Sequence, residues 1–162
     1  MRKFILLVVT YATLSFPARA QTGGNIHIVN GTCDSTSHTA EGPIDSDLTK
    51  RQSKFYCDSA VITFLDDYTG HVMIQFSQKA SHHSPSLAFA GRIQKNQPGD
   101  VGTIVQLDHV YLEPGEATTV SDGACKIFMK AQKMSAIACG IKVDETGRRT
   151  TAIVAFNVSP DQ

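Results

Sequence analysis

Short runs in which apolar and polar residues alternate make up most of the chain after its first 20 residues. This period of two residues is typical of β-strands with one buried face, and no window of about a dozen residues keeps an apolar stripe of helical period. We therefore expect an all-β fold, a single antiparallel meander that forms a sandwich or a barrel of about eight strands. The expected strands are residues 25–30, 55–65, 71–79, 86–93, 104–113, 125–130, 134–143 and 148–158.

The later strands contain two cysteines at positions that predict a cross-strand pair. If Cys125 lies opposite Cys139, the same register places Ile127 opposite Ile137 and gathers the apolar residues of both strands on one face. A tight turn near residues 131–133 would close this hairpin. The pattern therefore predicts a buried disulfide between Cys125 and Cys139.

The next hairpin is expected to turn over residues 144–147, where Asp144 and Gly147 favour a turn. This turn would place Ile141 opposite Thr150. The apolar face of the preceding hairpin would then continue onto the last strand.

The remaining cysteines, Cys33 and Cys57, form the second disulfide by elimination. A turn over residues 66–70 puts Ile62 and Phe64 against the apolar face of the following strand, and alternation then places Cys57 on the opposite face. We expect this disulfide to hold the N-terminal segment across the outside of the sheet.

Residues 31–54 form a long, mostly polar connection. Such a connection is unusual in a compact domain. We interpret it as a mobile loop held at both ends by the disulfide between Cys33 and Cys57. The alternatives are a binding loop and a short helix that begins with Asp45 or Asp47 as its N-cap.

The first 20 residues have the layout of a cleaved secretory signal. A basic start at residues 2–3 precedes an apolar stretch over residues 4–16, and residues 18–20 form a small-x-small motif. The apolar stretch is shorter than the ~20 residues that a membrane-spanning helix needs. We expect a signal peptide over residues 1–20, a single β domain over residues 21–162, no transmembrane segment and a secreted or periplasmic location, where disulfides are favoured.

The charge of the chain gives no support for a nucleic-acid partner. The whole chain has 15 basic and 15 acidic residues, and removal of the three basic residues of the signal leaves 12 against 15. Nucleic-acid binding needs an excess of cations. Four basic side chains are nevertheless expected on the outward face of the last strands, where they would bind an anionic surface or keep the sheet from sticking. They are Lys126, Lys130, Lys142 and Arg149.

Histidine offers the candidate ligand-binding chemistry. His109 and Tyr111 are two residues apart on one expected strand, so their side chains point the same way, and we take them as a candidate ligand site. Zinc or copper binding is an alternative. Its candidate ligands are His71, Met73, His82, His83 and His109. The simpler interpretation is that these side chains are solvated or hydrogen-bonded, and we expect no cofactor.

Catalytic patterns are absent from the sequence. It contains no GxSxG, and two disulfides would leave no free thiol as a nucleophile. The acidic pairs at residues 45 and 47, 66–67 and 144–145 lie among turn residues and lack EF-hand spacing. Enzyme function is therefore the weaker interpretation.

A self-consistent strand core without a catalytic set favours an exported, non-enzymatic binding protein of the cell envelope. Its partner would be a protein, a glycan or a small molecule, bound at the mouth of the sheet structure or by residues 33–57. Two alternatives remain open. One is a subunit of an extracytoplasmic assembly that uses strand addition at a sheet edge. The other is zinc or copper binding by histidine.

Overall fold

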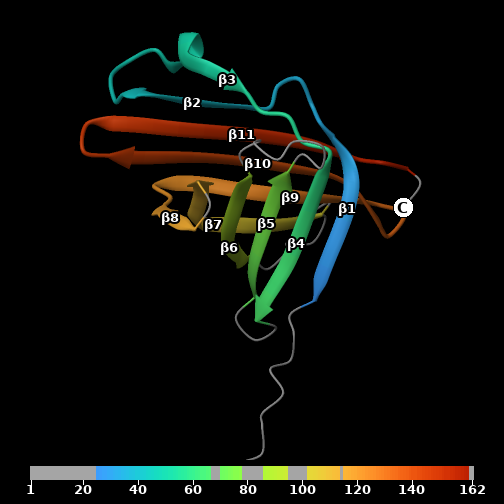
Figure 1. The fold of residues 1–162 in the computed structure, drawn as a ribbon. Helices are drawn as coiled ribbons and strands as arrows, with labels where there is room; N and C mark the ends of the chain where they lie inside the picture. The colour runs from blue at the N-terminus through green and yellow to red at the C-terminus, as the bar shows by residue number, and fades with distance from the viewer. Residues whose placement is uncertain (1–24, 67–69, 78–85, 95–101, 114, 161–162) are drawn as a thin grey trace, which may run out of the picture.

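The structure is a computed structural model that describes residues 25–66, 70–77, 86–94, 102–113 and 115–160. The described chain is all-β, as the alternation predicts, apart from one turn of 3-10 helix (Figure 1). The predicted signal peptide lies outside the described residues. Within them, no helix is long and apolar enough to span a membrane. The elements are β1 (Ile26–Cys33), β2 (His38–Pro43), η1 (Leu48–Arg51), β3 (Gln52–Lys54), β4 (Ser59–Asp66), β5 (His71–Ser77), β6 (Leu87–Ile93), β7 (Thr103–Glu113), β8 (Glu116–Thr119), β9 (Asp122–Lys130), β10 (Lys133–Glu145) and β11 (Arg148–Val158).

Eight of the described strands form a closed antiparallel barrel. Hydrogen-bonded neighbours follow the order β1-β4-β5-β6-β7-β9-β10-β11, and β1 also pairs with β11, which closes the sheet (Figure 1). Successive strands of the barrel are neighbours, so the predicted meander is confirmed, and the architecture is a barrel. The short β8 pairs with β7, while β2 and β3 extend the sheet from β11.

The barrel closes where β1 changes its partner. Residues 26–30 pair with β4, whereas residues 31–33 pair with residues 156–158 of β11. Gly31 lies at this change. A Cβ atom added to it would be 2.1 Å from the backbone oxygen of Asn157 and 2.6 Å from Cζ of Phe156. The two strands therefore meet at a distance that only glycine allows.

Aromatic and aliphatic side chains fill the barrel. The ring of Phe76 lies 5.9 Å from that of Phe89 and 5.8 Å from that of Phe156, between centroids. All three rings are buried, together with isoleucines and valines from the surrounding strands. An eight-stranded barrel is narrow enough for side chains to fill it. The interior is therefore a packed core.

The predicted register of the cysteine hairpin is confirmed. Cys139 of β10 lies opposite Cys125 of β9, Ile137 lies opposite Ile127, and a disulfide joins the two cysteines. Both cysteines are buried. The disulfide therefore connects two adjacent strands inside the core.

The predicted register of the last hairpin is wrong by two residues. Ile141 lies opposite Ala152, and Thr150 lies opposite Val143. The strands run on to a two-residue turn, Thr146 and Gly147, both with positive φ as a tight hairpin turn requires. A shift of two residues keeps every side chain on its predicted face, so the core-facing set of β11 is still correct.

The predicted pairing of Cys33 with Cys57 is confirmed, but its predicted position is wrong. Cys57 is buried and belongs to the core cluster. The reason is that β4 begins at Ser59 and not at residue 55, so the alternation is interrupted between Cys57 and the strand. The disulfide therefore joins β1 to the core side of the chain just before β4.

Residues 31–54 are ordered, and their interpretation as a mobile loop is wrong. The segment contains the end of β1, then β2, η1 and β3. β2 pairs with residues 148–153 of β11, and β3 pairs with β2. The proposed alternative of a short helix is correct for Asp47, whose carboxylate accepts hydrogen bonds from Thr49 at the start of η1. We call residues 38–54 the β2–β3 extension (upper part of Figure 1).

A β-bulge interrupts the alternation of β7. Ala90 of β6 lies opposite His109, but the next residue, Gly91, lies opposite Leu107, so Asp108 is inserted. The buried positions change from Leu107 to Val110 as a result. Tyr111 is only partly buried, and the alternation after the bulge places it on the outer face with His109.

Candidate functional site

A cavity of about 440 Å³ lies between the β2–β3 extension and the rim of the barrel. Residues far apart in the sequence form its walls: the extension supplies one side, β6 and β7 supply the other, and Thr150 of β11 connects them. Cavities of this size hold small organic molecules. The predicted candidates His109 and Tyr111 do not line this cavity.

Hydroxyl groups form the wall that belongs to the sheet. Ala152 of β11 points into the core, and the next residue on the same face is Thr150, which lines the cavity. Across the sheet, Thr150 lies opposite Glu41, Ala152 lies opposite Thr39, and Thr39 lies opposite Ser53. The inner face of the barrel therefore continues onto the extension, where its side chains become polar.

Apolar side chains form the floor, at the rim of the barrel. Phe55 and Leu87 are buried, and Leu112 packs against the same core cluster. The floor of the cavity is thus the outer end of the core, and packing within the core holds these side chains in place. A ligand seated on it would bury apolar surface against these three residues.

Buried polar contacts hold the extension to the barrel. The hydroxyl of Ser37 donates a hydrogen bond to the backbone oxygen of Ala155 (3.2 Å) and accepts one from the backbone N–H of Ala155 (3.1 Å). The N–H of Phe55 donates to the backbone oxygen of Ser37 (3.0 Å). The Cys33–Cys57 disulfide closes the same segment. These contacts fix both ends of the extension, so the cavity wall is held in place without a ligand.

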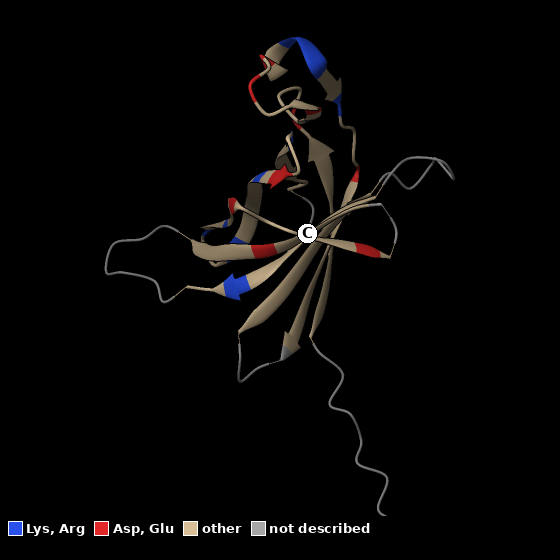
Figure 2. Cartoon of the chain, turned by 90° about the vertical axis from the view of Figure 1, so that its left-hand side faces the viewer, with Lys and Arg blue, Asp and Glu red and all other residues tan. Residues whose placement is uncertain are grey.

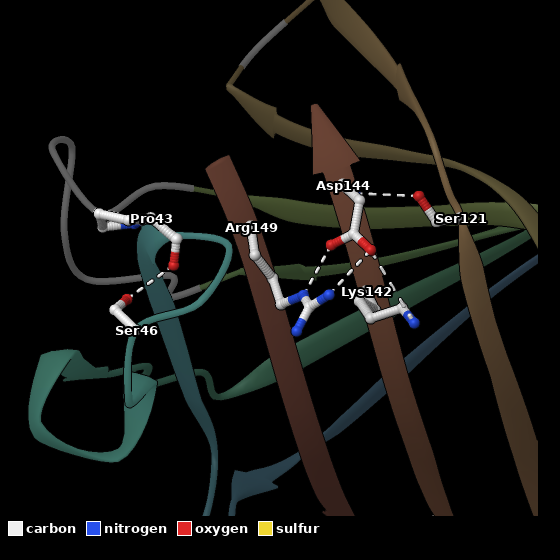
Figure 3. A network of polar contacts seen from close by, with 6 residues as sticks. All are labelled: Pro43, Ser46, Ser121, Lys142, Asp144 and Arg149. Atoms are coloured by element: carbon white, nitrogen blue, oxygen red, sulfur yellow. Dashed lines mark hydrogen bonds and ion pairs between the residues drawn. The ribbon is translucent and has the colours of Figure 1, made fainter. Parts of the chain in front are cut away.

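The polar network beside the extension involves Asp144, on β10 (Figure 3). Its carboxylate accepts two hydrogen bonds from Arg149, at 2.7 and 3.0 Å, and lies 4.0 Å from Nζ of Lys142. The hydrogen bonds from Arg149 hold the pKa of Asp144 below its usual value. The N–H of Asp144 donates to Ser121 at 2.9 Å. The network joins the ends of β10 and β11, and β11 is the strand that carries β2.

The charged side chains of the cavity differ in their partners. Glu41 forms an ion pair with Arg148. Arg51 and Lys54 also line the cavity, and neither forms an ion pair with any described residue. Figure 2 shows basic residues as blue ribbon in the extension. The acidic member of the lining is thus paired, while Arg51 and Lys54 have no acidic partner among the described residues.

The histidine cluster lies on the outer face of the barrel, around the β7 bulge. His109 Nδ1 donates to Asp108 Oδ1 at 2.9 Å, and His71 Nε2 lies 3.4 Å from Asp108 Oδ2. His71 is on β5 and Asp108 is on β7, and β6 lies between these two strands. The His71 side chain therefore crosses β6 to contact Asp108. Burial raises the pKa of Asp108, but the hydrogen bond from His109 and the charge of His71 outweigh it and lower this pKa below its usual value.

The histidine cluster does not form a metal site. Among the described residues, no group of three or more His, Cys, Asp or Glu side chains is placed to hold a metal ion. The carboxylate of Asp108 already contacts both rings. His82 and His83, which the sequence also suggested, lie outside the described residues.

The basic patch expected on the last strands is divided among separate partners. Lys142 and Arg149 both contact Asp144. Lys126 lies over the ring of Phe128, with Nζ 5.3 Å from the centroid. These contacts leave no common surface of unpaired cations among the three residues.

Sequence reasoning missed the residues that line the cavity. Arg51, Lys54 and Ser53 lie in the segment interpreted as a loop, and Thr150 was placed only as a strand residue. Two signals could have indicated them. A long polar segment enclosed by a disulfide is held near its neighbours, and a hydroxyl at a core-facing position of β11 marks the end of the core.

Comparisons with protein-family models, with curated proteins and with solved structures find no match to this chain.

Proposed function

We propose that this protein is exported and binds a small molecule in the cavity between the β2–β3 extension and the barrel rim. The observation that carries the proposal is the cavity itself: about 440 Å³, with an apolar floor and a hydroxyl wall held in place by a disulfide. Pockets of about 300 to 1,000 Å³ with a few convergent polar groups are typical ligand sites.

Two features support export. Both disulfides are formed, and all four cysteines take part in them. Disulfides form and persist in oxidising compartments and are rare in the cytosol. The secretory layout of residues 1–20 agrees with this, and the proposed location is the periplasm or the cell exterior.

The chemistry of the lining supports binding without catalysis. The polar groups are hydroxyls, two cations and Glu41, and Arg148 already neutralises that carboxylate. Among the described lining residues there is no histidine or cysteine to act as base or nucleophile. Such a lining can orient a ligand, but it offers no activated group to attack one.

Filling the cavity is the direct test. Ser53 is exposed on the edge strand β3 and lines the cavity, so Ser53→Trp is expected to block the site without disturbing the core. Three probes with the same eight-carbon tail would be titrated by calorimetry and NMR: octanoate, 1-octanol and octylammonium. We expect at least one to bind the unmodified protein, and Ser53→Trp to weaken that binding more than ten-fold, about 1.4 kcal/mol or more.

The matched control is Gln52→Trp, which adds the same side chain at the neighbouring position of β3, outside the cavity lining. We expect it to leave binding within two-fold of the unmodified protein. Absence of binding by all three probes, or equal effects of the two tryptophans, would contradict the proposed function.

A second candidate function is assembly by strand addition at β1. Among the described residues, residues 26–29 pair with β4 alone, because hydrogen bonding to β11 and the residue after it begins at Asn30, whose backbone oxygen accepts from the N–H of Ser159. Ile26 and Ile28 in this part of β1 are 62% and 65% exposed. An exposed apolar strand edge is a template for another strand. The partner we propose is a second copy of this chain.

Light scattering over a range of concentrations tests this assembly. We expect a dimer, and Ile28→Lys is expected to abolish it by placing a charge in the added interface. The control is Ile153→Lys, at an isoleucine that is 44% exposed on β11 but paired with strands on both sides. A monomer at every concentration, or equal effects of both lysines, would exclude assembly at this edge.

A further inference from the structure

The polar part of the cavity has an excess of positive charge. Of its three charged residues, Glu41 is paired with Arg148, whereas Arg51 and Lys54 have no ion-pair partner in the part of the chain that the structure describes. The remaining polar groups are hydroxyls, which donate or accept equally well. The cavity therefore offers more donors than acceptors to a ligand.

Arg51 is held in position by the strand beside it. A Cβ atom added to Gly42 of β2 would lie 2.9 Å from Oγ of Ser46, 3.0 Å from Cδ of Arg51 and 3.0 Å from Cδ2 of Leu48. The arginine stem thus packs directly on the glycine backbone. A guanidinium whose stem is already ordered loses less conformational freedom when it binds an anion. Lys54 also borders a second cavity on the extension, lined by His38 and Gln52 among others.

The opposite side of the cavity is apolar, with Phe55, Leu87 and Leu112 as its floor. One ligand fits both sides: a compact molecule with an apolar body on this floor and an anionic head near Arg51. A neutral apolar molecule would leave the cations unused, and an amine would be repelled by them.

We infer that the cavity selects amphipathic acids, and that Arg51, assisted by Lys54, recognises the acidic head. This inference rests on the proposed function and assigns the ligand class of the same cavity. A planar guanidinium can bind a carboxylate through two parallel hydrogen bonds, which also sets the orientation of the bound acid.

The test compares how charge removal affects two probes with the same tail. Dissociation constants for octanoate and 1-octanol are measured with the unmodified protein, Arg51→Gln, Lys54→Gln and the double variant. We expect the ratio of the octanoate constant to the octanol constant to rise about ten-fold in the double variant, with most of the change in Arg51→Gln. Using the ratio removes any general effect of the substitutions on the apolar floor. Octylammonium is expected to bind the double variant better than the unmodified protein.

Lys50→Gln is the matched control. Lys50 precedes Arg51 in η1 and carries the same charge, but it does not line the cavity. We expect the octanoate-to-octanol ratio to stay within two-fold of its original value in this variant. A second variant, Gly42→Ala, keeps every charge and displaces the stem of Arg51, so it is expected to raise the ratio as Arg51→Gln does.

The outcomes separate this inference from the proposed function. If octanol binds and Ser53→Trp blocks it, while Arg51→Gln and Lys54→Gln leave the ratio unchanged, the cavity is a ligand site and the inference about acids is wrong. The inference is equally wrong if Lys50→Gln changes the ratio as much as the double variant does, because the effect is then one of overall charge. If no probe binds, both fail.

Discussion

Replacing Gly31 with alanine is expected to lower the free energy of unfolding by about 3 kcal/mol, the upper end of the usual cost of overpacking. The added methyl group would overlap the backbone oxygen of Asn157 and the ring of Phe156. A backbone atom within a paired strand has little room to yield, so β1 would have to move away from β11. Urea denaturation of Gly31→Ala against the unmodified protein gives this difference directly.

Gly140→Ala is the control for this prediction. Gly140 also lies within a barrel strand, β10, but nothing lies within 4 Å of the Cβ position there. We expect its free energy of unfolding to stay within about 0.5 kcal/mol of the original value, as for substitutions away from packed sites. Equal stabilities of Gly31→Ala and Gly140→Ala would mean that β1 and β11 do not meet closely at the closure.

Removal of the Cys125–Cys139 disulfide has the second large expected effect. The double variant Cys125→Ala with Cys139→Ala should be less stable by about 2 to 4 kcal/mol, because the unfolded chain loses a covalent constraint. The two cysteines are also buried, so their replacement leaves the core less well filled. Changing both residues avoids a free thiol. Thermal and urea unfolding under non-reducing conditions measure the loss.

The Cys33–Cys57 disulfide provides the comparison, since it encloses the β2–β3 extension and not the core hairpin. Its double alanine variant is expected to lose a similar stability, but also to weaken probe binding in the cavity. The Cys125 and Cys139 variant should bind the probes normally at temperatures where it is folded. A Cys125 and Cys139 variant as stable as the original protein would show that this crosslink contributes little to folding.

Where a strand contributes to the core, its sequence predicted it well. The apolar face predicted for residues 71–79 consists of Val72, Ile74 and Phe76, which alternate with polar residues and are all buried in β5. The cysteine hairpin was predicted to the residue because two independent requirements, a cross-strand disulfide and a continuous apolar face, agree on one register. The register predicted between β10 and β11 was wrong by two residues, because only the apolar pattern constrained it and the turn is shorter than expected.

The candidate site could not be predicted in the same way, because β2 and β3 do not contribute large apolar side chains. Thr39, Glu41 and Ser53 give no apolar alternation, and the strands are held by backbone pairing to β11 and to each other. Backbone hydrogen bonds do not require particular side chains, so the amino-acid sequence does not indicate this pairing. The bulge at Asp108 did leave one, since Leu107 and Val110 are three residues apart where a regular strand repeats every two.

The strand β11 takes part in two structures at once. Its last residues, 156–158, join β1 at the seam of the barrel, and its first residues, 148–153, support the wall of the cavity. The same backbone therefore borders both the seam and the cavity. If the cavity binds a ligand as proposed, we expect its occupancy to be linked to opening of the seam, so that the ligand protects amide protons along the seam from exchange although it touches none of them.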